Sequence, residues 1–323
     1  MSTDKFFGNQ RVLDFIRHAI KKNTLSHSLL VTGEKGLGKR TFARFLGKAL
    51  NCEKESFFEK CDCISCMKID SDNHPDVRWY GLNEDKTSVK IAEIKDLIHW
   101  MGLKPYEGKM KVFIVNDAHD MTLESQNALL KTLEEPPPQS QLILLTDHRN
   151  LLLETIVSRS VEIKLRPLDL KETVRILKNV YDMEKDTELL SQISGGNLGL
   201  ALDYATEGYL EENQKLVSEW IRTGSWEFFS ADKGKSREEQ RNLIDLLIRF
   251  LRDVLIYKEV SKREMLFFPH EIVRIREIAQ KHSVDEMMAL VKDLIRIRES
   301  LEDNLNQKIV SSYVSTVLER KLF

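Results

Sequence analysis

The sequence predicts a parallel-sheet α/β domain followed by a region that contains helices alone. Up to residue 165, short apolar segments alternate with segments of helical periodicity. The apolar segments are mostly continuous, which is typical of strands buried on both faces. Strands that alternate with helices favour a parallel sheet covered by helices on both sides. After Pro167 the strand signals end, so we expect only helices from there on.

The apolar segments and the helical patterns give the expected elements of the α/β domain. Strands are expected at residues 28–33, 76–80, 112–116, 141–146 and 161–165. Helices are expected at residues 12–20, 41–50, 91–101 and 126–134. The last of these helices ends before Pro136-Pro-Pro138, because consecutive prolines lack backbone donors and restrict the residue that precedes them.

Two helical domains are expected after the sheet. Helices at residues 169–180, 187–194 and 200–204, interrupted by Gly195-Gly-Asn-Leu-Gly199, form a small unit. Farther along, two apolar stripes at helical spacing predict the core of a helical bundle rather than a cofactor site. The stripes are Leu243, Ile244, Leu247, Phe250, Leu251, Val254 and Leu255, and then Ile309, Tyr313, Val317 and Leu318. Residues 231–239 are expected to form a polar loop. The expected domains are residues 1–166, 167–208 and 209–323.

The charge balance excludes some classes of protein. The 49 Lys and Arg residues nearly cancel the 51 Asp and Glu residues, so bulk charge would not hold nucleic acid or an anionic membrane. Residues 1–50 nevertheless carry 10 basic and 3 acidic residues, and we therefore expect any anion site there. No stretch approaches the roughly 18 consecutive apolar residues of a membrane span. Because Met1-Ser-Thr-Asp-Lys5 also lacks the layout of a signal peptide, we expect a cytoplasmic protein.

A glycine-rich segment, Gly33-Glu-Lys-Gly-Leu-Gly38-Lys39, lies between a predicted strand and a predicted helix. In this context Gly33, Gly36 and Gly38 let backbone N–H groups surround a phosphate, and Lys39 supplies a positive charge. The next residue is normally a Ser or Thr that ligates magnesium. Here it is Arg40, whose guanidinium has no lone pair to offer a cation. Thr41 does not replace it, because it points about 100° away on a helix. A glycine-rich turn without any ligand is the alternative interpretation.

The second half of a nucleotide-hydrolysing site is an Asp–Glu pair at the end of a later strand. The candidate strand ends in Asn116-Asp117-Ala118. If Asp117 holds the metal, the position of the base is Ala118. If Asp117 is the base, the position of the metal ligand is Asn116. The pair is incomplete in either register, and together with Arg40 this loss argues against hydrolysis.

All four cysteines lie within fifteen residues, at Cys52, Cys61, Cys63 and Cys66. In a reducing compartment such a cluster indicates a metal site before it indicates disulfides. Four thiolates bind Zn²⁺ tetrahedrally and leave no open position for a substrate, so the predicted role is structural. Free thiols or a redox pair are the alternative. Nearby His74 is expected to be a hydrogen-bonded turn residue rather than a fifth ligand.

Several segments together resemble the clamp-loader subunits of bacterial DNA polymerase III, which belong to the AAA+ class. They are the glycine loop, the cysteine cluster, Asn127-Ala-Leu-Leu-Lys-Thr-Leu-Glu-Glu-Pro-Pro137 and Ser158-Arg159-Ser160. The likeness covers essentially the whole chain. It implies an AAA+ nucleotide-binding-type α/β domain with an inserted zinc module at residues 52–66, then a small helical lid and an all-helical C-terminal collar domain for oligomerisation.

The resemblance also implies roles for particular residues. Its register sets Asn116 and Asp117 on the Asp–Glu pair of the hydrolysing subunits, and Thr146 on a nucleotide-sensing position. The hydrolysing relatives carry an arginine where this chain has Gly199. The family's Ser-Arg-Cys motif delivers an arginine finger to a neighbour's ATP site, and here that residue is Arg159, followed by Ser160 instead of cysteine. The family's cysteine spacing, C-x8-C-x2-C-x2-C, is one residue longer than the present C-x8-C-x-C-x2-C.

The function that the resemblance implies is that of a non-hydrolysing clamp-loader subunit. Such a chain would assemble with gamma/tau-type ATPase subunits and the delta subunit, and would help load a sliding clamp onto primed DNA. The implied cofactor is structural Zn²⁺, and whether ATP binds is left open. Two alternatives are a gamma/tau-type ATP-hydrolysing motor that tolerates Arg40, and a module that senses ATP without cleaving it.

Overall fold

The computed structural model describes residues 6–55, 60–81, 88–206, 212, 215–216, 218–219, 237–260, 263–300, 312, 314 and 316. The chain divides into two compact units. One comprises Met1–Thr187 with Ser194–Ala201, and the other comprises Glu188–Ile193 with Leu202–Phe323. The expected boundary at residues 208–209, the second apolar stripe (Ile309, Tyr313, Val317 and Leu318) and most of the expected loop 231–239 lie outside the described residues.

The first unit contains the predicted parallel sheet. Its five strands lie in the order β2-β3-β4-β1-β5, and every neighbouring pair is parallel. The strands are β1 (Ser28–Thr32), β2 (Val77–Tyr80), β3 (Lys111–Val115), β4 (Ser140–Thr146) and β5 (Val161–Lys164). Each lies within one residue of its predicted bounds. The sheet brings the carboxyl ends of β1, β3 and β4 to one edge, where the motif residues follow.

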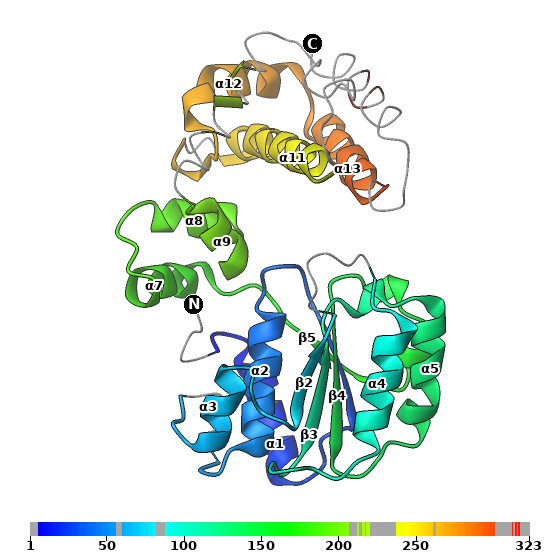
Figure 1. Cartoon of the computed structure of the whole chain (residues 1–323). Helices are drawn as coiled ribbons and strands as arrows, with labels where there is room; N and C mark the ends of the chain where they lie inside the picture. Colours follow the sequence, from blue (N-terminus) through cyan, green and yellow to red (C-terminus); the bar gives the residue numbers. More distant parts are fainter. Residues whose placement is uncertain are drawn as a thin grey trace. The chain divides into compact units, whose positions relative to one another are not determined.

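Helices cover both faces of the sheet, as the sequence predicts (Figure 1). On one face Leu29 and Val31 pack with residues of α1 (Gln10–Lys21) and α2 (Lys39–Asn51). On the other face Leu30 packs with residues of α4 (Ile91–Met101) and α5 (Leu123–Glu134). The prediction of two buried faces is wrong for β5. Only Ile163 of that strand is buried, because β5 is an edge strand.

Some short elements were not predicted from the sequence. Within the cysteine segment lies α3 (Ile64–Asp70), and before β5 lies α6 (Glu154–Val157). The short 3-10 turns η1 (Ala118–Asp120) and η2 (Arg149–Leu151) follow β3 and β4. A helix of one or two turns shows too few apolar repeats to produce a recognisable 3.6-residue period.

Helices alone follow the sheet in the described residues, as predicted. They are α7 (Leu170–Val180), α8 (Thr187–Ile193), α9 (Leu198–Tyr204), α11 (Arg237–Val260), α12 (Ile272–Lys281) and α13 (Val284–Ser300), with 3-10 turns η5 (Arg263–Met265) and η6 (Pro269–Glu271). The first apolar stripe is confirmed as core, because its α11 residues pack against α12 and α13. The expected loop at 231–239 is wrong for residues 237–239, which form the polar start of α11. None of the described helices meets the length and apolarity that crossing a bilayer requires.

The helical unit buries one carboxylate. Asp253 of α11 is fully buried, and it accepts a hydrogen bond of 2.7 Å from the backbone N–H of Phe268 and one of 3.3 Å from Arg252. Burial raises the pKa of Asp253 to about 6. An unfolded aspartate titrates near pH 3.9. The folded state therefore binds the proton more tightly, so this group's stabilising contribution is present below about pH 4 and is lost as the pH rises through about 6.

Asp253→Asn is expected to remove this pH dependence. Between pH 5 and pH 7.5, the free energy of unfolding of the parent chain should fall relative to the variant by about 1.4 kcal/mol, which follows from one group whose pKa moves from about 4 to about 6. Urea unfolding of both chains at the two pH values measures this difference. The control is Asp285→Asn, at an exposed position of α13, and its difference from the parent should stay constant. A constant difference for Asp253→Asn as well would contradict the assignment.

Candidate functional site

The glycine loop lies between β1 and α2, which is the context that the sequence predicted. Gly33, Gly36 and Gly38 have φ values of 148°, 89° and 83°. Residues that carry a side chain rarely adopt φ values in this range, so the loop requires glycine at these positions. Gly38 immediately precedes the first helical residue, Lys39, and the N–H groups of the first turn of α2 have no partner within the helix.

The ammonium group of Lys39 is held by the loop itself. Its Nζ atom donates hydrogen bonds to the carbonyl oxygens of Gly33 at 2.6 Å and Glu34 at 3.0 Å. Burial lowers the pKa of Lys39, against the opposing influence of the nearby Asp147 and Asp117 carboxylates. Two of the three N–H donors of this ammonium are therefore engaged by the loop backbone.

The residues after Lys39 provide no evident magnesium ligand. Arg40 is exposed, and its guanidinium carbon lies 6.0 Å from the centre of the Trp79 ring, which places it on the β2 side of the helix. Thr41 is partly buried. A guanidinium over an indole ring is a cation–π contact, which is a structural use of Arg40 that does not involve a nucleotide.

The incomplete Asp–Glu pair follows β3. Asp117 has a φ of 46°, and its carboxylate accepts a hydrogen bond from the side-chain amide of buried Asn116. The amide engages one of the two carboxylate oxygens of Asp117. The two residues that follow β3 therefore bond to each other.

Thr146, at the end of β4, contacts a histidine that the sequence interpretation missed. Its buried hydroxyl lies 3.2 Å from Nδ1 of His119 and accepts a hydrogen bond of 3.1 Å from the backbone N–H of His148. Asp147 lies between Thr146 and His148 in the chain, and its carboxylate is 3.3 Å from Nε2 of His119. The sequence did contain a signal for this contact, because these polar residues directly follow two predicted strands.

The segment that begins α9 closes directly onto the glycine loop. The backbone N–H of Gly199 donates to the carbonyl of Gly36 at 3.0 Å, and the side-chain amide of Asn197 donates to the carbonyl of Lys35 at 2.8 Å. A Cβ atom on Gly199 would lie 2.6 Å from the Cα of Gly36. No side chain fits at Gly199 while this contact persists, and an arginine is excluded with the rest.

Gly199→Ala is expected to destabilise the chain by about 1 to 3 kcal/mol, the usual cost of forcing extra atoms into close packing. The added methyl group would meet backbone atoms of Gly36, which cannot rotate away as a side chain can. Gly47→Ala in α2 is the matched control. There the new Cβ would make an ordinary 3.6 Å contact with Val77, and alanine favours the helix. Urea unfolding of both variants measures the effect, and equal stability would contradict the close backbone contact.

The four cysteine thiols converge in one buried cluster. Cys52 follows α2, Cys63 precedes α3, and the Sγ atom of Cys52 lies 3.5 Å from that of Cys61 and 4.0 Å from that of Cys63. All four sulfur atoms, including that of Cys66, lie within 4.8 Å of one another, and none is in a disulfide. Tetrahedral Zn–S bonds of 2.3 Å separate sulfur atoms by about 3.8 Å. The donor set therefore fits a four-thiolate zinc site.

The buried thiols differ in how readily they ionise, and only that of Cys63 has a lowered pKa. Burial raises the pKa of the Cys66 thiol. Burial acts in the same direction on Cys63, but backbone N–H groups of Cys66 and Glu53 outweigh it and lower the pKa of Cys63 to about 7. Backbone donors directed at a sulfur favour its thiolate form, which is the form that binds metal.

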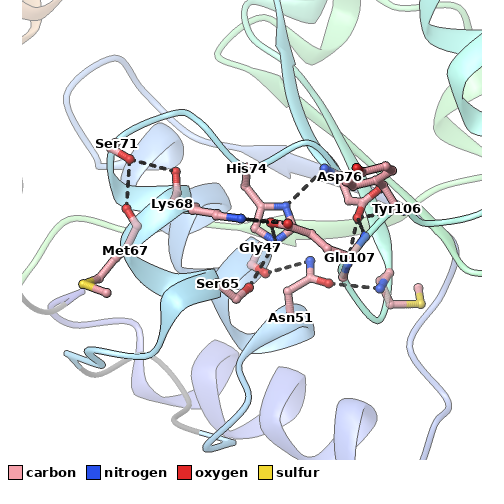
Figure 2. A network of polar contacts seen from close by, with 12 residues as sticks. Gly47, Asn51, Ser65, Met67, Lys68, Ser71, His74, Asp76, Tyr106 and Glu107 are labelled. Carbon is pink, nitrogen blue, oxygen red and sulfur yellow. Dashed lines mark hydrogen bonds and ion pairs between the residues drawn. The ribbon is translucent and has the colours of Figure 1, made fainter.

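A polar network joins the cysteine segment to the sheet (Figure 2). Buried His74 bonds through both ring nitrogens: Nδ1 accepts from the backbone N–H of Asp76 at 3.1 Å, and Nε2 lies 3.1 Å from the Ser65 hydroxyl. The Asp76 carboxylate in turn accepts the backbone N–H groups of Tyr106, Glu107 and Gly108. With Nδ1 accepting, the proton sits on Nε2, which leaves His74 no free lone pair for a metal.

Arg159 lies between α6 and β5 on the surface of the first unit. Its guanidinium donates to the Thr155 carbonyl at 3.1 Å and pairs with Glu134 at 2.7 Å, and the side chain is 36% exposed. An exposed pair of this kind contributes about 0 to 1 kcal/mol. The following Ser160 bonds instead to Ser28 at the start of β1, at 2.8 Å. Arg159 can therefore exchange its partner at little cost.

A parallel α/β core with a glycine-rich loop and a following helical region is the architecture of phosphate-loop proteins. The comparisons with known proteins place the chain among the subunits of DNA polymerase III. The family described as "DNA polymerase III, delta subunit" matches residues 8–169. The family described as "DNA polymerase III, delta subunit, C terminal" matches residues 214–313. The chain belongs to the DNA polymerase III delta-subunit family.

Two relatives found by sequence are also subunits of DNA polymerase III. The chain is 27% identical over 319 residues to DNA polymerase III subunit delta' of Bacillus subtilis, covering 96% of this chain and 95% of that protein. It is 26% identical to the gamma subunit of Buchnera aphidicola, covering 88% and 76%. A solved structure of a gamma subunit-related protein from Thermotoga maritima is 19% identical, with a TM-score of 0.46 over 96% of this chain and 99% of that one.

Proposed function

We propose that this chain is a non-hydrolysing subunit of a DNA polymerase III clamp loader, of the AAA+ class and the delta' type. It assembles with gamma/tau-type ATPase subunits and a delta subunit, and it helps load a sliding clamp onto primed DNA through the assembled complex. Relatives of both the delta' and the gamma type match most of its length, which supports a shared assembly.

The observation that carries the non-hydrolysing role is the closed glycine loop. Lys39 bonds to two loop carbonyls, and the loop backbone at Gly36 contacts Gly199 directly. Arg40 and the Asn116–Asp117 pair add independent losses of magnesium ligands. Each defect removes a different part of the machinery for phosphoryl transfer, so restoring one residue would not restore hydrolysis.

Arg159 is the group through which the chain acts on a neighbour. A guanidinium in trans neutralises charge that develops on the transferred phosphoryl group, and this does not require the donating subunit to bind ATP. The partly exposed, weakly held position of Arg159 supports this role. The cysteine cluster holds structural Zn²⁺, which fixes the segment around α3 against α2.

Reconstitution tests the proposed assembly. The purified chain is mixed with a gamma/tau-type ATPase subunit and a delta subunit and passed over a gel-filtration column. We expect one complex that contains all three and loads a clamp onto primed DNA, and no loading when this chain is left out. Loading of equal efficiency without the chain would contradict the proposal.

An ATP-sensing module is the second candidate, because the loop glycines and Lys39 are retained in the sequence. Equilibrium binding of labelled ATP distinguishes the two functions. Saturable binding that is lost in Lys39→Ala would favour the sensing module, and absence of binding favours the closed loop.

A further inference from the structure

Three polar side chains meet where β3 and β4 end, outside both the cysteine cluster and the glycine loop. His119 belongs to η1, which follows β3, and Asp147 with His148 directly follows β4. Since β3 and β4 are adjacent parallel strands, their carboxyl ends bring these residues to the same edge of the sheet. One ligand atom from each of the three lies within 4.8 Å of the others.

The distances among these atoms approach those of a coordination sphere. The Asp147 Oδ1 atom lies 3.3 Å from Nε2 of His119 and 4.0 Å from Nε2 of His148. The two imidazole rings are 5.0 Å apart between centroids, at 73° to each other. A metal with ligand bonds of about 2.1 Å separates neighbouring ligand atoms by about 3.0 to 3.4 Å. A small movement of the partly exposed His148 side chain would complete this arrangement.

Thr146 orients the two histidines through its hydroxyl group. Its hydroxyl contacts Nδ1 of His119, so that Nε2 of His119 faces Asp147. The same hydroxyl accepts the backbone N–H of His148. A hydrogen bond to one ring nitrogen fixes which nitrogen is available to a metal, and metal-binding histidines almost always have such a partner.

The Asp147 carboxylate lies near the Lys39 ammonium group, and one of its two oxygen atoms is still available to a bound cation. The Oδ1 atom of Asp147 is inaccessible to solvent and has no hydrogen-bond partner within the described part of the chain. A second carboxylate, that of Asp120, lies 3.8 Å from Nε2 of His119. Buried carboxylate oxygens are costly without a partner, and a bound cation supplies one.

We propose that His119, Asp147 and His148 form a second metal site, for a divalent transition-metal ion of the Zn²⁺ or Co²⁺ type. Two imidazole nitrogens with one carboxylate oxygen suit such ions, whereas Mg²⁺ and Ca²⁺ prefer oxygen ligands alone. Three protein ligands leave at least one coordination position for water or for a group from another molecule. The inference does not depend on the proposed function.

A competing arrangement has the same distances. A protonated His119 could pair with Asp147 without any metal, and metal binding therefore decides between the two. The probe is Co²⁺, added to the full-length chain whose cysteine cluster has first been loaded with Zn²⁺. The Co²⁺ absorption spectrum separates the two sites, because only cysteine ligands produce thiolate-to-metal charge transfer.

We expect one equivalent of Co²⁺ to bind with a spectrum of nitrogen and oxygen ligands, without thiolate bands. Loss of a hydrogen-bond partner of a metal-binding residue typically weakens metal affinity 10- to 100-fold. Thr146→Val should therefore weaken binding within about that range, and His119→Asn or His148→Asn, which remove a ligand, should weaken it by more than about 100-fold. Millimolar Mg²⁺ should not displace the bound ion.

The matched control is His282→Asn, which removes a histidine that lies between α12 and α13 and is also near a carboxylate, that of Glu286. It should leave the Co²⁺ titration unchanged. If His119→Asn does not fold, His148→Asn decides, because the His148 side chain is 34% exposed. Failure of the parent chain to bind Co²⁺ outside the cysteine cluster, or unchanged affinity in His148→Asn, would overturn the proposal.

Discussion

Arg159→Ala is expected to lower ATP turnover at the neighbouring subunit's site by on the order of 10³-fold, the usual contribution of an arginine that acts in trans. The chain itself should fold and assemble normally. Its guanidinium contacts only the Thr155 carbonyl and exposed Glu134 among the described residues, and such surface contacts contribute little to stability. The measurement is single-turnover hydrolysis in the reconstituted clamp loader, with gel filtration to verify assembly.

Two control variants separate this role from a general change of surface charge. Arg149→Ala removes another exposed arginine of the same unit, which pairs with Glu154 and Glu162 at 3.5 Å each, and should leave turnover unchanged. Glu134→Gln removes the local partner of Arg159 and should preserve or raise turnover, because the guanidinium is then free to meet phosphate. Unchanged turnover in Arg159→Ala would show that Arg159 is an ordinary surface arginine.

Cys66→Ser is expected to have the largest effect on stability. The Cys66 side chain is fully buried in the first turn of α3, and serine nearly preserves its shape. The change therefore tests metal ligation rather than packing. Losing a structural metal is among the few single changes that cost more than about 4 kcal/mol. Zinc content per chain should fall from one equivalent to well under one. The midpoint of urea unfolding should move to a lower urea concentration.

Ser71→Ala is the control for this variant. Ser71 lies just beyond α3, and its exposed hydroxyl donates only to carbonyls of the same helix in the described structure, at 3.0 and 3.2 Å. Its zinc content should equal that of the parent, with a stability change within about 0.5 kcal/mol. A parent chain that contains well under one equivalent of zinc would refute the site, and the cluster would then hold free thiols.

Much of the α/β core could be predicted because its signals are local. A continuous run such as Leu29–Val31 has no polar face, so it indicates a strand buried on both sides, and the strands were placed within a residue. Burial of β5 was overestimated because strand order decides which strand is at the edge. The helix α3 was missed because its seven residues are too few to show a helical period.

The site residues also divide into those that local sequence signals reveal and those that only the fold brings together. The glycines, Lys39 and the cysteines could be found because each motif is contiguous or nearly so in the chain. The meeting of His119 with Asp147 depends on β3 lying next to β4, and the contact of Gly36 with Gly199 depends on the course of the chain after the sheet. Neither contact can be read from the spacing of residues in the sequence. The missing arginine at Gly199 was recognised, but its physical reason, a direct backbone contact, required the structure.

The most direct test of the central claim is ATP turnover by the purified chain alone, with magnesium and primed DNA. The closed glycine loop, the absent magnesium ligand at Arg40 and the Asn116–Asp117 pair predict a rate no higher than that of the Lys39→Ala variant. Robust turnover that is lost in Lys39→Ala would contradict the account, and the chain would then be an ATP-hydrolysing motor.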